Sequence, residues 1–79
     1  MLTFEYEPDN VLEVTLDAEG LADLLLALSR LKPGDHEHLF TPAWGAYPLT
    51  EDFPNRDLVP IHKVTVSFVA EEREAQAGG

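Results

Sequence analysis

The sequence predicts an α+β fold, a mostly antiparallel four-stranded sheet with one helix packed on one face, in the order β-β-α-β-β. Three observations predict it: two neighbouring segments that alternate apolar and polar residues, one leucine-rich segment with helical spacing, and a later alternating segment. With 79 residues, 44% of them hydrophobic, the chain suits one small domain. We assign that domain to residues 1–70 and expect residues 71–79 to form a flexible C-terminal tail.

The first two strands are expected at residues 2–7 and 11–17, where apolar residues occupy every even position. Pro8-Asp9-Asn10 lies between them and supplies residues that favour turns. A three-residue turn keeps all the apolar side chains on one face of the hairpin, whereas a two-residue turn would mix the faces. The even positions are Leu2, Phe4, Tyr6, Leu12, Val14 and Leu16.

This register pairs Phe4 with Val14 on the apolar face and Glu5 with Glu13 on the other face. Two carboxylates that oppose each other directly destabilise a strand pair. We therefore expect either that the polar face contacts a partner, or that solvent and Lys63 relieve the repulsion between the two carboxylates. In both cases this face is expected to be exposed or to cover a partner.

A helix is expected after the second strand, with Asp17 as its N-cap and Glu19 in its first turn. Arg30 and Lys32 are expected in the last turn, and Pro33-Gly34 ends the helix. A leucine stripe runs along one side and is expected to form the core; it contains Leu21, Leu24, Leu25, Leu28 and Leu31.

A short strand is expected at residues 36–41, an irregular segment with four prolines at 42–60, and a last strand at 61–69. The irregular segment carries Trp44, Tyr47 and Phe53. Trp and Tyr are frequent in binding hot spots, so this segment is a candidate contact surface. The alternative is that Trp44 folds back over the open end of a small core.

Three histidines form the candidate metal site. His36 and His38 share a strand face with Phe40, and His62 has the parity of the apolar side of the last strand. If Phe40 points inward, the three imidazoles can gather and bind zinc. If Leu39 points inward instead, His36 and His38 face solvent. No sequence motif supplies a nucleophile, a phosphate loop or a catalytic pair, so no catalytic residue is assigned.

The net charge is −10, with fifteen acidic residues against five Lys and Arg. Such a surface disfavours nucleic acid and anionic membranes and favours a basic protein partner. The chain has no cysteine, no signal-peptide pattern and no apolar run long enough for a membrane span, so a cytoplasmic location is expected.

One set of motifs resembles a known family. The stretch GDHEHLFTPAWG (34–45), followed by Leu49-Thr50-Glu51 and the strand PIHKVTVSFV (60–69), is similar to the Immunity protein 32 family of bacterial polymorphic toxin systems. The resemblance covers roughly residues 20–69, and Ala46 stands where the family pattern has a second glycine. It implies a small cytoplasmic protein that neutralises a cognate toxin by binding it, and it implies no catalytic residues.

From these observations we expect a non-enzymatic immunity-type protein that needs no cofactor and binds a protein partner, such as a basic toxin domain, as a monomer or homodimer. The alternatives are a metal-binding protein that uses His36, His38 and His62, and a structural or regulatory subunit that dimerises through a sheet edge. The expected partner-binding residues are Glu5, Glu13, Asp35, His36, His38, Trp44, Tyr47 and Phe53.

Overall fold

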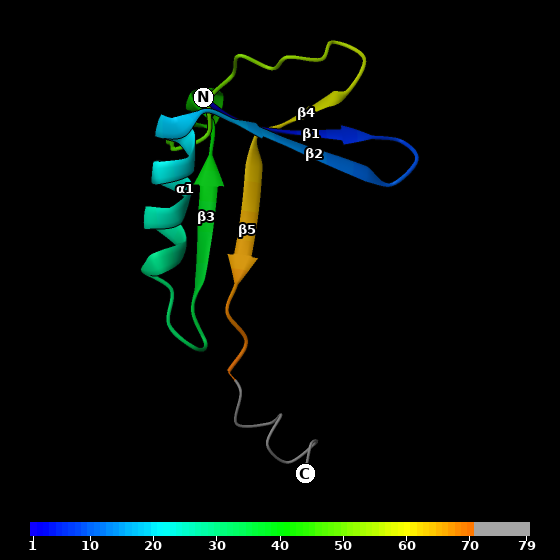
Figure 1. Ribbon diagram of the computed structural model, residues 1–79. Helices are drawn as coiled ribbons and strands as arrows, with labels where there is room; N and C mark the ends of the chain where they lie inside the picture. Colours follow the sequence, from blue (N-terminus) through cyan, green and yellow to red (C-terminus); the bar gives the residue numbers. More distant parts are fainter. Residues whose placement is uncertain (71–79) are drawn as a thin grey trace.

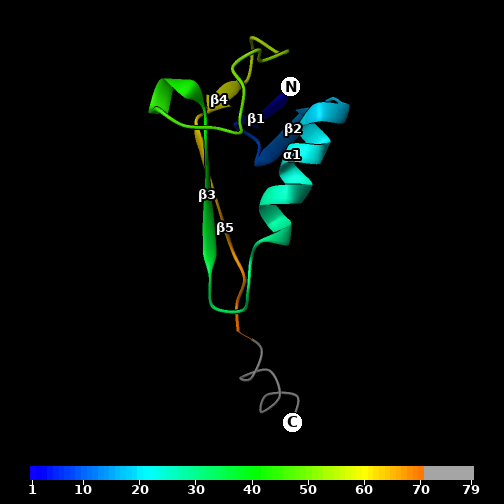
Figure 2. The same ribbon diagram turned by 90° about the vertical axis from the view of Figure 1, so that its left-hand side faces the viewer.

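The computed structural model describes residues 1–70 and shows an α+β fold of one helix and two small antiparallel sheets (Figures 1 and 2). The first sheet has the order β2-β1-β4, and the second pairs β3 with β5. The expected class is confirmed, but the expected single four-stranded sheet is wrong. Residues 71–79, the expected tail, lie outside the described residues. The elements are β1 (Leu2–Glu7), β2 (Val11–Leu16), α1 (Ala18–Ser29), β3 (His36–Phe40), η1 (Pro42–Trp44), β4 (Val59–Ile61) and β5 (Lys63–Ser67).

The two sheets separate at His62, the second residue of the segment 61–69 that the sequence predicts as one strand. The chain before His62 pairs with β1 as β4, and the chain after it pairs with β3 as β5. Thr41 holds the corner, because its backbone N–H donates to the His62 carbonyl at 3.1 Å and its hydroxyl lies 2.6 Å from His62 Nδ1. The two sheets therefore point in different directions, and β3 and β5 extend away from the β1–β2 hairpin (Figure 1).

The β1–β2 hairpin has the expected register. Phe4 pairs with Val14 and Glu5 with Glu13, across a three-residue turn. Asn10 takes the left-handed conformation at φ 68° and donates its N–H to the Glu7 carbonyl. Asparagine tolerates this conformation better than most residues, which explains its place at the end of the turn.

Helix α1 begins as expected at Asp17, whose carboxylate accepts a 2.8 Å hydrogen bond from the Gly20 N–H. The same carboxylate oxygen lies 2.7 Å from the N-terminal ammonium of Met1, which raises the pKa of the ammonium and lowers the pKa of Asp17. The helix ends at Ser29 with Arg30 as its C-cap, so the expected basic last turn is wrong. No helix within residues 1–70 has the length and apolar character that crossing a membrane requires.

The core lies where the helix, the start of β1 and the inner face of β3 meet. Its buried members are Leu2, Phe4, Ala27, Leu39 and Leu49. The expected leucine stripe is only partly in this core, since Leu21, Leu25 and Leu28 are exposed. The helix instead presents the line Gly20, Leu24 and Ala27 to the sheets. Gly20 sets this orientation, because a Cβ there would overlap the Met1 carbonyl oxygen, so only glycine permits the close approach.

Both faces of the first part of β1, Leu2 to Glu5, are covered, so the expected exposure of the polar face is wrong at Thr3 and Glu5. The segment 50–58 arches over the side of the first sheet that lies opposite α1 (Figures 1 and 2). Thr50 exchanges backbone and hydroxyl hydrogen bonds with Leu2, and the Asn55 N–H donates to Glu5 Oε2 at 3.1 Å. Thr3 and Glu5 are therefore fully buried, although polar alternation predicts that they face solvent or a partner.

Candidate functional site

The outer face of β3 carries a continuous line of aromatic rings, which we name the aromatic row. It consists of His36, His38, Phe40 and Trp44. The successive ring centroids are 4.8, 5.9 and 6.5 Å apart. The first three residues alternate along one strand, which places their side chains on the same face. The row therefore brings three of the expected partner-binding residues together with Phe40, whose orientation the sequence left open.

Trp44 joins the row because a short 3-10 helix turns the chain directly after β3. The Trp44 N–H donates to the Thr41 carbonyl at 2.9 Å, and Gly45 ends the turn in the left-handed conformation at φ 84°. The Glu51 carboxylate accepts from the Ala43 N–H and ties the turn to the next segment. Trp44 is 59% exposed, so it lies over Phe40 without filling the core. The alternative that Trp44 closes the core is wrong.

Polar groups flank the aromatic row along β5. The ring nitrogen Nδ1 of His38 lies 3.0 Å from the Thr65 hydroxyl, which fixes the orientation of the imidazole. The ammonium of Lys63 lies 5.9 Å from the centroid of the Phe40 ring, a distance typical of a cation–π contact. This face therefore combines flat apolar rings with a hydrogen-bonding edge and one cation. Such a combination can hold the surface of another protein and contains no group positioned as a nucleophile.

The three histidines do not gather. Leu39 is fully buried, so His36 and His38, which have the opposite parity to Leu39 along β3, point outward. His62 lies at the corner between the sheets, where its ring meets Thr41 and packs edge-on against Phe53 at 5.7 Å. Within residues 1–70, no three His, Cys, Asp or Glu side chains are close enough to hold a metal ion. The alternative in which Phe40 points inward and the histidines converge is therefore wrong, and the one in which Leu39 points inward is confirmed.

The remaining expected site residues are dispersed. Glu5 is buried beneath the segment 50–58, whereas its strand neighbour Glu13 is exposed. Asp35 lies in the turn before β3, where its backbone accepts from the Phe68 N–H at 2.8 Å and its side chain is exposed. Phe53 is half-buried against His62. Of these residues, only Glu13 and Asp35 present their side chains to solvent.

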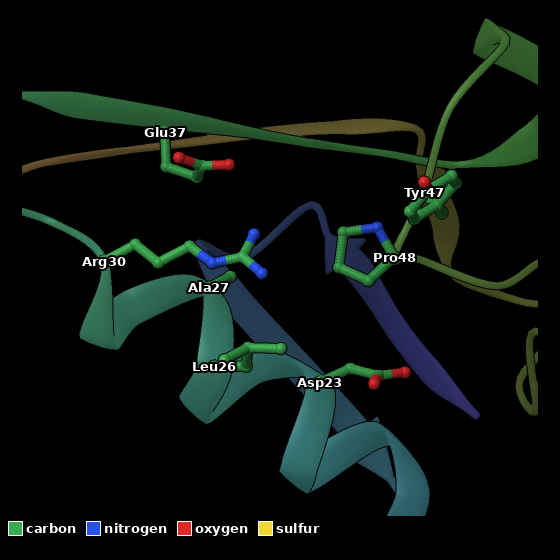
Figure 3. Close-up of a pocket in the computed structure, with 7 residues that line it drawn as sticks. All are labelled: Asp23, Leu26, Ala27, Arg30, Glu37, Tyr47 and Pro48. Carbon is green, nitrogen blue, oxygen red and sulfur yellow. The ribbon is translucent and has the colours of Figure 1, made fainter.

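Tyr47, which is 80% exposed, lies on the other side of β3, at the rim of a pocket of about 490 Å³ (Figure 3). The pocket lies between α1 and the inner face of β3, and the guanidinium of Arg30 reaches into it from the helix. Neither acid of the lining forms an ion pair with Arg30 at 4 Å or less in the described part of the chain. The lining residues are Asp23, Leu26, Ala27, Arg30, Glu37, Tyr47 and Pro48.

The sequence interpretation missed this pocket, although two signals for it were present. Glu37 lies between two histidines on a strand and must therefore face away from them. Asp23, Leu26 and Arg30 follow one another at helical spacing and so share one flank of α1. The missing information was which flank of the helix faces β3. The lining combines apolar side chains with three charged residues, Asp23, Arg30 and Glu37, that form no ion pair with one another within residues 1–70.

Comparisons of the chain with protein-family models, with curated proteins and with solved structures found no match. The resemblance to the Immunity protein 32 family therefore stays a prediction from the motif in residues 34–45 and its flanking segments.

Proposed function

We propose that this protein is a small immunity-type binding protein of the bacterial cytoplasm that neutralises a cognate toxin by direct contact, and that the aromatic row is its contact surface. The carrying observation is the row itself: residues from β3 and from the following turn converge on one uncovered face. The same residues belong to the motif that resembles the immunity family.

The physical character of the row supports protein binding over other functions. Aromatic side chains supply large contact areas and lose little conformational entropy, and Trp is among the residues most enriched in binding hot spots. The strand and the capped turn hold the rings in place, so little ordering is needed when a partner binds.

The net charge of −10 supports a basic partner. Such a charge attracts a basic protein over a distance of about one Debye length, about 8 Å at physiological salt, and accelerates its association. A toxin domain that acts on nucleic acid carries basic groups for its substrate, and an acidic protein seated on that surface would occlude it.

The test begins with capture of the partner by the tagged full chain from the source cells, followed by mass spectrometry of the intact complex. A stoichiometric basic protein whose toxicity is abolished by this chain is the expected result. The purified partner is then titrated against Trp44→Ala, for which the dissociation constant is expected to rise by at least about 30-fold, the loss typical of a hot-spot residue.

Tyr47→Ala is the matched control, because it removes an even more exposed aromatic ring on the opposite side of β3. It is expected to change the dissociation constant by less than about threefold. A large loss with Tyr47→Ala and none with Trp44→Ala would transfer the contact surface to the pocket. A captured partner whose activity is unaffected by the complex would exclude the immunity function.

A further inference from the structure

The outer edge of β2 is a free sheet edge with an apolar face. Strand β2 is terminal in the order β2-β1-β4, and no other described strand pairs with its outer side. On the side of the sheet that faces α1, its residues Leu12 and Val14 are 56% and 44% exposed, and the adjacent Tyr6 of β1 is 37% exposed. The hairpin projects beyond the helix, so α1 leaves this end of the sheet uncovered (Figure 1).

One flank of α1 continues this apolar surface. Leu21, Leu25 and Leu28 lie at spacings of four and three residues, which places them on one flank of the helix, and they are 44%, 56% and 36% exposed. The opposite flank, with Leu26 and Arg30, faces β3 at the pocket. In Figure 2 the first sheet runs from β4 through β1 to β2 toward the side on which α1 lies. The free edge of β2 and the helix therefore belong to the same side of the molecule.

The apolar surface is large for a domain of this size. Together the six side chains of the hairpin and the flank expose on the order of 500 Å², at the upper end of what a monomer usually leaves uncovered. A specific interface covers about 800 Å² on each partner, and paired backbone at a strand edge supplies the rest. Edge strands of soluble monomers are usually protected by charged side chains, proline or a bulge; β2 carries no lysine or proline, and Glu13 is its single charged residue.

We propose that the free edge of β2 pairs with β2 of a second copy of this chain, which forms a two-fold symmetric dimer with a continuous six-stranded sheet. Antiparallel pairing of two identical strands is the arrangement that a two-fold axis produces. The new pairing also gives hydrogen-bond partners to the backbone groups along an edge that the fold leaves open.

Side-chain parity and charge select the register. An axis at Glu13 would oppose the two Glu13 carboxylates, which is unfavourable. An axis between Glu13 and Val14 would mix the polar and apolar faces. An axis at Val14 opposes Val14 to its own copy, Leu12 to Leu16 of the second copy, and Glu13 to Thr15 of the second copy. This last register keeps both faces intact and separates the carboxylates.

The same register explains the exposed flank of the helix. Helix α1 follows directly after Leu16, and Leu16 of the second copy would lie opposite Leu12. Each helix therefore starts beside the uncovered end of the other copy's hairpin, where Leu21 and Leu25 can pack on Leu12 and Val14. The six side chains are uncharged, so two copies with a net charge of −10 can approach there with little local repulsion.

The test is the molecular mass of the full chain in solution, measured by light scattering and by sedimentation. Protein concentrations from about 10 to about 500 μM are used, because this range resolves dissociation constants in the micromolar range. The expected mass is twice the 8.8 kDa of the chain. Leu25→Glu is expected to raise the dimer dissociation constant by about 100-fold or more, since it places a carboxylate in an apolar contact of each copy. Leu26→Glu is the matched control, since Leu26 is 53% exposed on the opposite flank, and it is expected to remain dimeric.

A second measurement tests the register. The chain has no cysteine, so Val14→Cys introduces a single thiol that meets its own copy at the axis and is expected to form a disulfide-linked dimer under mild oxidation. Tyr47→Cys, at the pocket beside β3 and outside the proposed interface, is expected to remain uncrosslinked under the same conditions. A monomer at the highest concentration would overturn the proposal. So would a dimer that is insensitive to Leu25→Glu, and a dimer that fails to crosslink through position 14 would overturn the register.

Discussion

The substitutions Glu5→Lys and Glu13→Lys are expected to differ strongly in their effect on the stability of the fold, although the two glutamates are direct partners in the β1–β2 hairpin. Glu5 is 0% exposed, and Glu13 is exposed. Glu5 Oε2 accepts from the Asn55 N–H, and its other oxygen, Oε1, has no hydrogen-bond partner in the described part of the chain. The site thus holds one acidic side chain with one acceptor in use.

The free energy of unfolding that Glu5→Lys would lose has two parts: the hydrogen bond between Asn55 and Glu5, and the cost of burying a new charge. A hydrogen bond to a charged group contributes about 1.5–3 kcal/mol. An uncompensated buried ammonium, with the Asn55 N–H left unsatisfied, costs about 3 kcal/mol or more. A domain of 79 residues has a total stability of about 4–12 kcal/mol, so Glu5→Lys is expected to unfold most of the chain. Glu13→Lys is expected to change the stability by no more than about 0.5 kcal/mol.

The assay is urea denaturation followed by far-ultraviolet circular dichroism for the wild type and both variants. Glu5→Gln serves as a further control, because it retains an oxygen for the Asn55 N–H without adding length. It is expected to fold. If Glu5→Lys melts at the same urea concentration as Glu13→Lys, then segment 50–58 does not cover β1 in solution, and the polar face of the hairpin is open as alternation alone predicts.

Three further predictions concern the core and the helix start. Gly20→Ala is expected to lower the free energy of unfolding by about 1–2 kcal/mol in the same urea assay, since the added Cβ overlaps the Met1 carbonyl oxygen. A gain of about 1 kcal/mol, which is usual for Gly→Ala in a helix, would refute the close approach of Gly20 to Met1. Leu39→Ala is expected to cost about 2–5 kcal/mol, and Leu26→Ala, at a 53% exposed site, less than about 1 kcal/mol; equal urea midpoints would contradict the assignment of Leu39 to the core. Asp17→Asn keeps the cap but loses the ion pair with the terminal ammonium, so its melting temperature is expected to fall below that of the wild type. The ammonium pKa is raised above 8.0, so its contribution is lost as the pH rises through the raised value. The Asp17 pKa is lowered below 3.8, so its contribution is lost as the pH falls through the lowered value. A difference in melting temperature that persists unchanged at both pH extremes would exclude the ion pair as its cause.

The hairpin and the helix start could be predicted because both depend on residues that are close in sequence. The alternation of β1 and β2 and the turn between them determine that Phe4 faces Val14. Asp17 caps the helix through a contact with Gly20, only three residues away. The aromatic row follows partly from the same rule, since alternate residues of β3 must share a face, but that rule does not say which face is outside.

The parts that the sequence interpretation missed depend on contacts between distant residues. The interpretation treated the leucine stripe as the core, but the contact of Gly20 with Met1 turns a different line of the helix inward. It treated residues 61–69 as one strand, but the contact of Thr41 with His62 divides the segment between two sheets. The pocket depends on the same rotation of α1, because only that rotation places Arg30 across from Glu37.

The amino-acid sequence by itself determined the class of fold, the hairpin register, the helix cap and the set of residues that share each strand face. Each of these depends on periodicity and on hydrogen bonds within a few residues. Only the tertiary structure decided what covers each face, namely that Glu5 is buried and that His36, His38 and Trp44 stay exposed in one row. The physical reason is that a pattern of polarity places side chains on faces, whereas burial requires another segment to pack there; here that segment lies 50 residues further along the chain, at Asn55.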